Sequence, residues 1–321
     1  VRTKGELRAL KRGPMESEEM VRLLVPMMDE RNLRIFEEEG GADFSHTCDV
    51  DGTRWRFRVN MLTQMGRIGL VARRVSNWIP DFAGLNLPPI MEDLCKYDQG
   101  MILLAGVTGS GKTTTIASML DWVNQNYRKH ILTLEDPIEF TFTEDKCLIN
   151  QREIHRDTHG FNQALRSALR EDPDIILVGE MRDIETIRLA LTAAETGHLV
   201  FATLHTSSAA KTIDRIIDVF PAGEKSMVRS MLSESLRAVI AQTLMKRIGG
   251  GRIAAHEIML ATPAIRNLIR EDKVAQMYSA IQTGQAHGMQ TLDQHLQDLL
   301  KKGMISRLDA QSRATNKEIF V

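Results

Sequence analysis

Cysteine is scarce in this sequence, with 3 residues of this type among 321. Cys48, Cys95 and Cys147 lie far apart, and no two of them form a C-x-x-C pair. This spacing argues against a disulfide framework and against a four-cysteine zinc site. Isolated thiols of this kind are typical of buried side chains in a reducing compartment.

Long apolar runs are also missing. The longest, such as residues 101–107, are typical of buried strands and fall well short of the roughly 20 residues that a helix needs to cross a bilayer. Residues 1–8 are charged and lack the apolar core of a signal peptide. They also lack a start methionine, so we expect residues to be missing before Val1. These features favour a cytoplasmic protein with no transmembrane segment.

An excess of charge of one sign is absent too. The chain has 41 Lys and Arg residues against 42 Asp and Glu residues, for a net charge of -1. A generic nucleic-acid-binding protein normally has a basic excess, so the composition argues against that class and leaves only a local basic patch open. The apolar fraction of 43% and the charged fraction of 26% are ordinary for a globular protein, and the length is typical of two domains.

Residues 1–75 are predicted to form a small mixed α/β domain. Residues 20–25 begin a stretch with helical spacing. Residues 54–60 alternate basic with apolar side chains, the pattern of a strand with one solvent-exposed face. With a second strand at residues 68–75, they predict a hairpin whose exposed face carries arginines. The candidate residues are Arg56, Arg58, Arg73 and Arg74.

Residues 76–90 contain several prolines and glycines and are predicted to be a linker to a second domain, residues 91–321. In that domain apolar runs alternate with helical segments, which predicts a largely parallel sheet covered on both faces. The runs are residues 101–105, 131–134, 175–178 and 199–203. The C-terminal third is expected to be mostly helical, because Thr262-Pro263 suits a helix start and leucines at helical spacing follow from residue 292.

The most specific motif is Gly106-Val-Thr-Gly-Ser-Gly-Lys-Thr113, which matches G-x-x-x-x-G-K-[ST] at every fixed position. A predicted strand leads into it and a predicted helix follows. Glycines let backbone N–H groups surround phosphates, and the helix N-terminus adds its positive dipole end. We expect Lys112 to reach the β- and γ-phosphates of ATP and Thr113 to bind Mg²⁺. The candidate nucleotide-binding residues are Thr108, Gly109, Ser110, Gly111, Lys112, Thr113 and Thr114.

Two acidic segments follow other predicted strands. Residues 174–180 form a short apolar strand that ends in Glu180, where a carboxylate can polarise the attacking water or bind Mg²⁺ through water. Residues 134–140 place three carboxylates, Glu139 among them, at the edge of a parallel sheet that faces ligands. Without the phosphate loop, the first segment is a strand that meets solvent and the second an acidic turn capped by Pro137.

Two histidines, His198 and His205, bracket a further predicted strand. Their spacing does not suit a zinc pair on one helical turn, and no cysteine assists. A sensor role near the γ-phosphate suits His205 better, although a structural contact is the commoner role of a single histidine.

The arginine face of the hairpin also has two interpretations. It is a solvated surface, or it completes the nucleotide site of a neighbouring subunit.

Taken in order, the four motifs resemble the secretion ATPase superfamily, whose members power type II secretion, type IV pili and conjugation. Its Walker A loop, aspartate box, Walker B strand and histidine box correspond to residues 106–113, 134–140, 175–180 and 197–206. Within the superfamily, residues 150–153, 168–183 and 193–198 resemble the PilT-like family of pilus retraction ATPases. So does Ala264-Ile265-Arg266-Asn267-Leu268-Ile269-Arg270, a motif associated with retraction.

The resemblance implies an N-terminal PAS-like α/β domain, truncated at its start, and a C-terminal RecA-like P-loop ATPase domain. It implies a hexameric motor that hydrolyses ATP with Mg²⁺ and drives type IV pilus retraction and twitching motility. Glu139, Glu180, His198 and His205 occupy the catalytic positions, with Glu180 the first choice for general base, and Arg266 with its helix serves coupling. The implied partners are further copies of the chain, the inner-membrane platform protein PilC and the paralogue PilU, at the cytoplasmic face of the inner membrane.

The chain could not form the zinc-binding tetracysteine insertion that is common in pilus assembly and type II secretion ATPases, which favours retraction over extension. Four alternatives stay open: a type IV secretion or conjugation ATPase, an accessory retraction paralogue, a nucleotide-gated scaffold with negligible turnover, and a DNA translocase. Near-neutral charge and the lack of a basic groove interleaved with aromatic residues disfavour the last of these.

Overall fold

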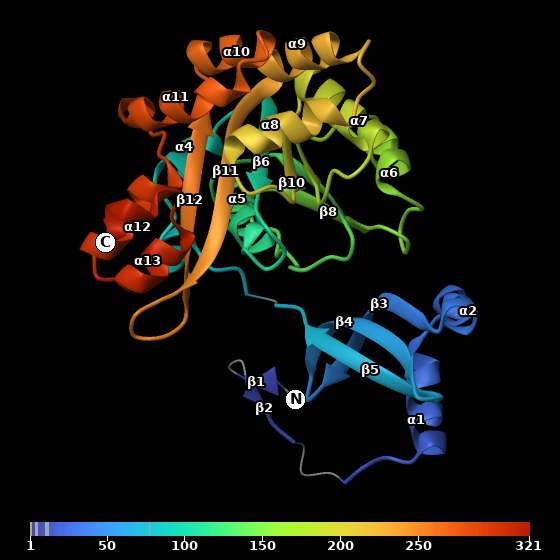
Figure 1. The fold of residues 1–321 in the computed structure, drawn as a ribbon. Helices are drawn as coiled ribbons and strands as arrows, with labels where there is room; N and C mark the ends of the chain where they lie inside the picture. The colour runs from blue at the N-terminus through green and yellow to red at the C-terminus, as the bar shows by residue number, and fades with distance from the viewer. Residues whose placement is uncertain (1, 4–5, 10–12, 77) are drawn as a thin grey trace. The chain divides into compact units, whose positions relative to one another are not determined.

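A three-stranded sheet and a seven-stranded sheet organise the chain, and each belongs to a different part of the sequence (Figure 1). The computed structural model describes residues 2–3, 6–9, 13–76 and 78–321. The chain divides into two units, residues 1–76 and residues 77–321. A separate two-residue pair, β1 (Arg2–Thr3) with β2 (Glu6–Leu7), lies within the first unit.

The first unit is a small antiparallel sheet packed against two helices. Its elements are α1 (Ser17–Leu24), η1 (Val25–Met27), α2 (Glu30–Glu39), β3 (Gly41–Val50), β4 (Thr53–Gln64) and β5 (Arg67–Arg74), and the strand order is β3-β4-β5. Phe44, Val59 and Met61 form its core together with Leu24 of α1. Helix α2 ends where Gly40 adopts a left-handed conformation, with φ of 73°, that glycine accommodates easily.

The predicted hairpin is confirmed as β4–β5, but one of its four candidate arginines, Arg74, does not lie on the predicted face. Arg58 lies directly opposite Arg73, and Phe57 lies opposite Arg74. Directly opposite residues of an antiparallel pair point to the same face, and successive residues of a strand alternate. Arg56, Arg58 and Arg73 therefore share the face opposite the core. Arg74 lies on the other face, with its guanidinium 4.7 Å from the ring centroid of Trp55.

The second unit contains the parallel sheet that the sequence predicts. Its strand order is β12-β11-β6-β10-β9-β7-β8, and every neighbouring pair is parallel except β11 with β12. The strands are β6 (Gly100–Ala105), β7 (His130–Glu135), β8 (Leu148–Glu153), β9 (Ile175–Val178), β10 (Leu199–Leu204), β11 (Leu236–Lys246) and β12 (Arg252–Leu260).

Helices cover both faces of this sheet, so successive strand residues enter different cores. Leu103 packs with the helices on one face, and Leu104 packs with those on the other. The first face carries α6 (Phe161–Ala168), α7 (Ile184–Glu195), α8 (Ala209–Asp218), α9 (Lys225–Ser235), α10 (Pro263–Arg270) and α11 (Met277–Thr283). The second carries α3 (Phe82–Leu85), α4 (Ile90–Leu94) and α5 (Lys112–Asn126).

Near the turn that connects them, β11 and β12 pack against a third, smaller core. It is built with α12 (Leu292–Lys301), α13 (Arg307–Arg313) and η4 (Lys317–Phe320), while η2 (Val274–Gln276) and η3 (Gly284–His287) flank α11.

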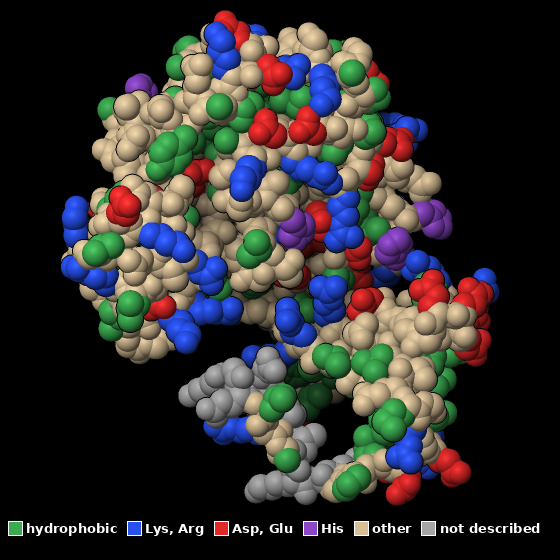
Figure 2. All heavy atoms as spheres, viewed as in Figure 1, with side chains coloured by type: hydrophobic (Ala, Val, Ile, Leu, Met, Phe, Trp, Pro, Cys, Tyr) green, Lys and Arg blue, Asp and Glu red, His purple; other side chains and the backbone are tan. Residues whose placement is uncertain are grey.

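No helix in the described part of the chain is both long and apolar enough to cross a membrane. Basic and acidic side chains lie interspersed over the visible face of this unit (Figure 2), as the balanced composition suggests.

The expectation of a mostly helical C-terminal third is wrong for residues 236–260. These residues form the hairpin β11–β12, whose first strand pairs with β6 in the middle of the sheet. Gly249, Gly250 and Gly251 turn the chain with positive φ angles. The helices begin afterwards, and Thr262 caps α10 as predicted, because its side chain accepts a hydrogen bond from the Ile265 N–H.

Part of the predicted linker belongs to the second unit. Asp81 caps α3 through a 2.7 Å hydrogen bond that its carboxylate accepts from the Gly84 N–H. Phe82 and Leu85 then pack against the core around α5, where the Phe82 ring meets Trp122 edge-on. A stretch that looked like loose linker in the sequence is therefore anchored by apolar contacts.

Replacing Phe201, a fully buried residue of the central strand β10, should destabilise the second unit most directly. For Phe201→Ala we expect the free energy of unfolding to fall by about 3–5 kcal/mol, since a large side chain leaves a cavity at a site with no room to collapse. Urea denaturation followed by circular dichroism measures this. Leu308→Ala, at a side chain that is 78% exposed, is the matched control and should change stability by less than ~0.5 kcal/mol.

Candidate nucleotide-binding and catalytic site

The phosphate loop lies between a fully buried strand and a long helix. Strand β6 ends at Ala105, and α5 begins at Lys112. A Cβ atom on Gly106 would lie 2.4 Å from the Ser110 Oγ and 2.5 Å from the Gln242 carbonyl oxygen, so only glycine fits there. All seven candidate nucleotide-binding residues, 108–114, lie in this loop and the first turn of α5. Backbone N–H groups at the start of a helix bind phosphates.

Lys112 lies folded over the loop. Its Nζ donates hydrogen bonds to the carbonyl oxygens of Gly106 at 2.7 Å and Val107 at 3.2 Å. Burial lowers the pKa of Lys112, and the nearby carboxylates of Glu180 and Glu139 partly oppose that shift. The ammonium group is therefore held beside the loop with two carboxylates within electrostatic range.

Parallel register brings Glu180 and His205 to the edge of the sheet that holds this loop. Leu204 of β10 lies opposite Ala105 of β6, and Ala202 lies opposite Val178 of β9. Glu180 and His205 follow the ends of β9 and β10. A Cβ atom on Gly179 would lie 2.9 Å from the Leu134 carbonyl oxygen of β7. Glycine at this position therefore lets the backbone after β9 pass close to β7.

Glu180 is held by Arg182 and His205. Its Oε1 lies 2.6 Å from the Nε of Arg182 and 3.1 Å from the Nε2 of His205. Burial raises the pKa of Glu180, but the hydrogen bonds and charges of Arg182 and His205 outweigh burial and hold the pKa below its usual value. Glu180 is therefore a fixed, ionised carboxylate at neutral pH. Sequence reasoning missed Arg182, which lies two residues after Glu180 on the same extended segment.

The three carboxylates of residues 134–140 differ in their environments. Glu135 is buried at the end of β7, where it accepts hydrogen bonds from the Thr133 hydroxyl at 2.7 Å and the Gln151 amide at 3.4 Å. Burial raises the pKa of Glu135 to about 7, although those hydrogen bonds oppose the shift. Asp136 and Glu139 are exposed. Of the three, Glu139 is the carboxylate that acts on the Lys112 ammonium.

The structure does not bring His198 to this edge within one chain. His198 precedes β10, and its carbonyl oxygen accepts a hydrogen bond from the Gly100 N–H at the start of β6. The six residues of β10 lie between it and His205, so the two residues are about 23 Å apart at 3.3 Å per residue step. Its Nδ1 contacts the Ala193 carbonyl oxygen at 3.0 Å. A catalytic role for His198 in the site of its own chain therefore conflicts with this placement.

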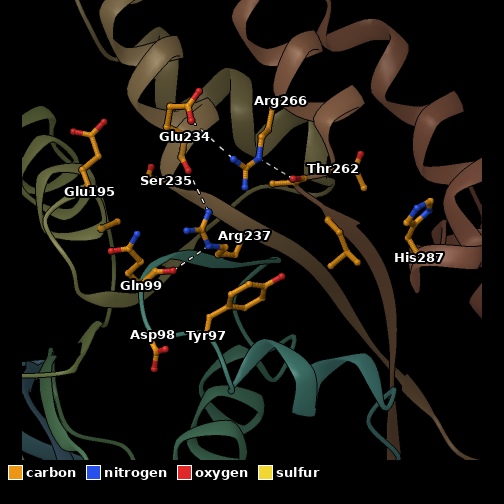
Figure 3. Close-up of a pocket in the computed structure, with 13 residues that line it drawn as sticks. Tyr97, Asp98, Gln99, Glu195, Glu234, Ser235, Arg237, Thr262, Arg266 and His287 are labelled. Carbon is orange, nitrogen blue, oxygen red and sulfur yellow. Dashed lines mark hydrogen bonds and ion pairs between the residues drawn. The ribbon is translucent and has the colours of Figure 1, made fainter.

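The predicted coupling motif, residues 264–270, lies at the opposite edge of the sheet, beside a cavity of about 1020 Å³ (Figure 3). Ile265 and Ile269 anchor α10 in the core. The Arg266 Nε donates a hydrogen bond to the Ala261 carbonyl oxygen at 2.9 Å. Arg237, at the start of β11, lines the same cavity and donates to the Gln99 carbonyl oxygen at 3.0 Å. Burial and the neighbouring Arg266 lower the pKa of Arg237.

The edge that holds the phosphate loop offers oxygen atoms of the kind that Mg²⁺ binds. Among the residues that the structure describes, no group of three or more His, Cys, Asp or Glu could hold a metal ion by itself. In nucleotide sites Mg²⁺ is usually bound by one or two protein oxygens together with phosphate oxygens. The Thr113 hydroxyl in the first turn of α5 and the Glu180 carboxylate fit such a shared site.

P-loop nucleotide hydrolases are defined by a strand, a phosphate loop and a helix in succession, with a carboxylate after another parallel strand of the same sheet. The chain belongs to the family of type II/IV secretion system proteins, whose pattern matches residues 2–250. Within this family it is an ATPase.

Three relatives define the similarity further. The type IV pilus retraction ATPase PilT of Pseudomonas aeruginosa is 58% identical over 320 residues, which are 100% of this chain and 92% of that protein. A twitching motility protein of Neisseria gonorrhoeae is 51% identical over 319 residues, 99% of this chain and 84% of that protein. The crystal structure of the pilus retraction motor PilT with bound ADP is 47% identical, with a TM-score of 0.86 and coverage of 94% and 85%.

The raised pKa of Glu135 makes a testable contribution to stability. The folded chain keeps this proton up to about pH 7, whereas an ordinary glutamate loses it near pH 4.5. Between these values the folded state binds more protons than the unfolded state, so the contribution is complete below pH 4.5 and disappears as the pH rises through about 7. Urea denaturation should show wild type losing stability relative to Glu135→Gln between pH 5 and pH 8. A difference that does not change with pH contradicts this account.

Proposed function

We propose that this chain is the subunit of a hexameric ring motor that hydrolyses ATP to drive type IV pilus retraction and twitching motility. Its similarity to PilT along the full chain supports this proposal. The observation that carries the enzymatic part is the ionised Glu180 carboxylate, which is oriented by Arg182 and His205 on the sheet edge that holds the phosphate loop.

In the proposed reaction the loop N–H groups and Lys112 bind the β- and γ-phosphates. Glu180 positions the attacking water and accepts its proton, while Arg182 and His205 keep the carboxylate oriented. Glu139 adds negative charge near Lys112. Mg²⁺, held by Thr113 and by Glu180 through water, would neutralise charge on the phosphate oxygens. Holding the water and the phosphoryl group in fixed positions is the main contribution a protein makes to this reaction.

The ring proposal gives the arginine face of the first unit a role. Arg58 and Arg73 lie side by side on the face opposite the core, with Arg56 on the same face of β4. We propose that these guanidinium groups approach the nucleotide of a neighbouring subunit, where they stabilise charge that develops on phosphoryl transfer. Arg74, stacked on Trp55 at the other face, is the weakest candidate.

The coupling proposal concerns the edge of the sheet away from the nucleotide. Helix α10 exposes Ala264, Asn267 and Arg270 there, and its Arg266 lines the cavity of Figure 3. We propose that this region transmits the motion of the ring to the platform protein PilC, with PilU as a second partner. Such a motor would work at the cytoplasmic face of the inner membrane.

Glu180→Gln tests the motor directly. It keeps the shape of the side chain but cannot take up a proton or accept the Arg182 hydrogen bonds on both of its terminal atoms, so turnover should fall by about 10²–10⁴-fold while ADP still binds. In a strain that lacks its retraction ATPase, the wild-type gene should restore twitching and the variant should not. Glu318→Gln, an exposed carboxylate in η4 to which no role is assigned, is the matched control and should behave as wild type.

Two outcomes contradict the proposal. Full turnover in Glu180→Gln removes its assigned role. Normal turnover by the wild type together with no effect on twitching, but restored conjugation or protein secretion, supports the alternative cargo instead.

Mixed rings test the arginines. Arg58→Ala should lower turnover strongly, whereas Arg67→Ala, at the exposed turn end of the same hairpin, should not. When Arg58→Ala and Glu180→Gln subunits are mixed, an interface that receives Glu180 from one and Arg58 from the other is complete. Activity should therefore reappear on mixing two inactive proteins. Mixtures that stay inactive, although mass measurement shows mixed rings, place Arg58 in the site of its own chain or outside any site.

A further inference from the structure

Gln242, in the middle of β11, contacts the phosphate loop on two sides. Its Nε2 donates a 2.7 Å hydrogen bond to the Ser110 carbonyl oxygen, and its Oε1 accepts a 2.8 Å hydrogen bond from the Thr115 hydroxyl. These two partners lie on either side of Lys112 in the sequence. The Gln242 side chain is 5% exposed, so both hydrogen bonds are shielded from water.

The glycines of the loop leave room for this residue. A Cβ atom on Gly111 would lie 2.8 Å from the Gln242 Nε2, and one on Gly106 would lie 2.5 Å from the Gln242 carbonyl oxygen. Two fixed glycines of the phosphate loop therefore meet the same residue of a strand that the sequence motif does not include. The fit of the loop depends on β11 as well as on its own sequence.

His256 holds the amide oxygen of Gln242. The two residues are directly opposite each other in the β11–β12 pair, and the His256 Nε2 lies 3.1 Å from the Gln242 Oε1. The Ser110 carbonyl oxygen needs the amide nitrogen as donor, so the amide oxygen faces His256, and the His256 Nε2 must carry a proton to donate to it. Burial and the neighbouring His295 lower the pKa of His256 well below 6.5, which leaves the ring neutral. Within the described residues the His256 Nδ1 has no hydrogen-bond partner, as suits the unprotonated nitrogen of that tautomer.

His256 is itself fixed from the other side. Its backbone N–H donates a 2.9 Å hydrogen bond to the Nδ1 of His295 on α12, and the two rings stack with centroids 5.4 Å apart. A flipped Gln242 amide would place its oxygen against the Ser110 carbonyl oxygen, so this carbonyl selects one amide orientation.

We propose that Gln242 is a positioning residue for nucleotide binding. It holds Ser110 and Thr115 so that the loop N–H groups and Lys112 meet the phosphates, and His256 acts through Gln242 by holding its amide oxygen. The inference rests on the phosphate loop being the nucleotide site of this ATPase, and it goes beyond the motif residues by adding two residues of the β11–β12 hairpin.

The test is the split between KM and kcat in Gln242 variants. Gln242→Met keeps the volume and removes both hydrogen bonds, and Gln242→Glu keeps the acceptors but places an oxygen against the Ser110 carbonyl. The KM for ATP and the Kd for a fluorescent ADP should rise about tenfold in the first and more, up to about a hundredfold, in the second. The kcat at saturating ATP should stay within about twofold of wild type, because the variants weaken binding of the substrate and of the transition state equally. Thr243→Val, the next residue of β11, should leave both parameters unchanged.

The role of His256 is tested by conservative replacement and by a double variant. His256→Gln keeps a donor at about the same reach and should keep the KM within about threefold of wild type. His256→Leu removes the donor and should raise the KM about as much as Gln242→Met. Because His256 acts through Gln242, the double variant Gln242→Met, His256→Leu should have the KM of Gln242→Met alone.

Three outcomes overturn the inference: an unchanged KM in both Gln242 variants, a lower kcat at unchanged KM, or fully additive effects of the Gln242 and His256 variants. A merely structural role would give the second, since it removes folded enzyme without changing the site. Lys112→Ala separates this inference from the site assignment. If Lys112→Ala binds nucleotide as wild type does, the assignment of the phosphate loop fails and not only the role of Gln242.

Discussion

The parallel pairing of β6 with β10 is the constraint on which the rest of this structure depends. Six consecutive residue pairs hold the strands in register, so Ala105 and Leu204 end at the same level. Whatever follows each strand must then meet at one edge of the sheet. The phosphate loop follows β6, His205 follows β10, and Glu180 follows β9 on the other side of β10. Residues separated by a hundred positions in the sequence become a single site because backbone hydrogen bonds align the strands that precede them.

The same strands give the second unit two chemically different edges. One edge holds the phosphate loop and the fixed Glu180 carboxylate, and the other holds Arg237, Arg266 and a large polar cavity. The β11–β12 hairpin runs between them. In the middle of the hairpin, Gln242 contacts the loop and His256 contacts Gln242. At the edge that holds the cavity, β11 begins near Arg237, and β12 ends at Leu260 before the chain enters α10. This buried two-stranded element therefore joins the hydrogen bonds at the phosphate loop to the motif proposed to act on the pilus machinery.

Local sequence predicted what depends on local chemistry. The phosphate loop, the arginine hairpin and the Thr262 cap follow from glycine conformations, strand alternation and capping, and all three appear where expected. The hairpin β11–β12 was missed because its apolar residues lack clear alternation, being buried on both faces. His198 and His205 look equivalent in the sequence, yet a strand of six residues separates them. Gln242 is one amide in an apolar run, and only the sheet order reveals that it lies against the loop.

We propose that ATP is hydrolysed at a site which one chain begins and its neighbour completes. The most direct measurement is turnover per subunit over a wide dilution series, with the molar mass determined by light scattering at each concentration in ATP and Mg²⁺. We expect a hexamer, and we expect turnover per subunit to fall as the hexamer dissociates on dilution. Activity and assembly should then follow the same concentration dependence. A monomer that hydrolyses ATP equally well at every dilution would contradict this proposal.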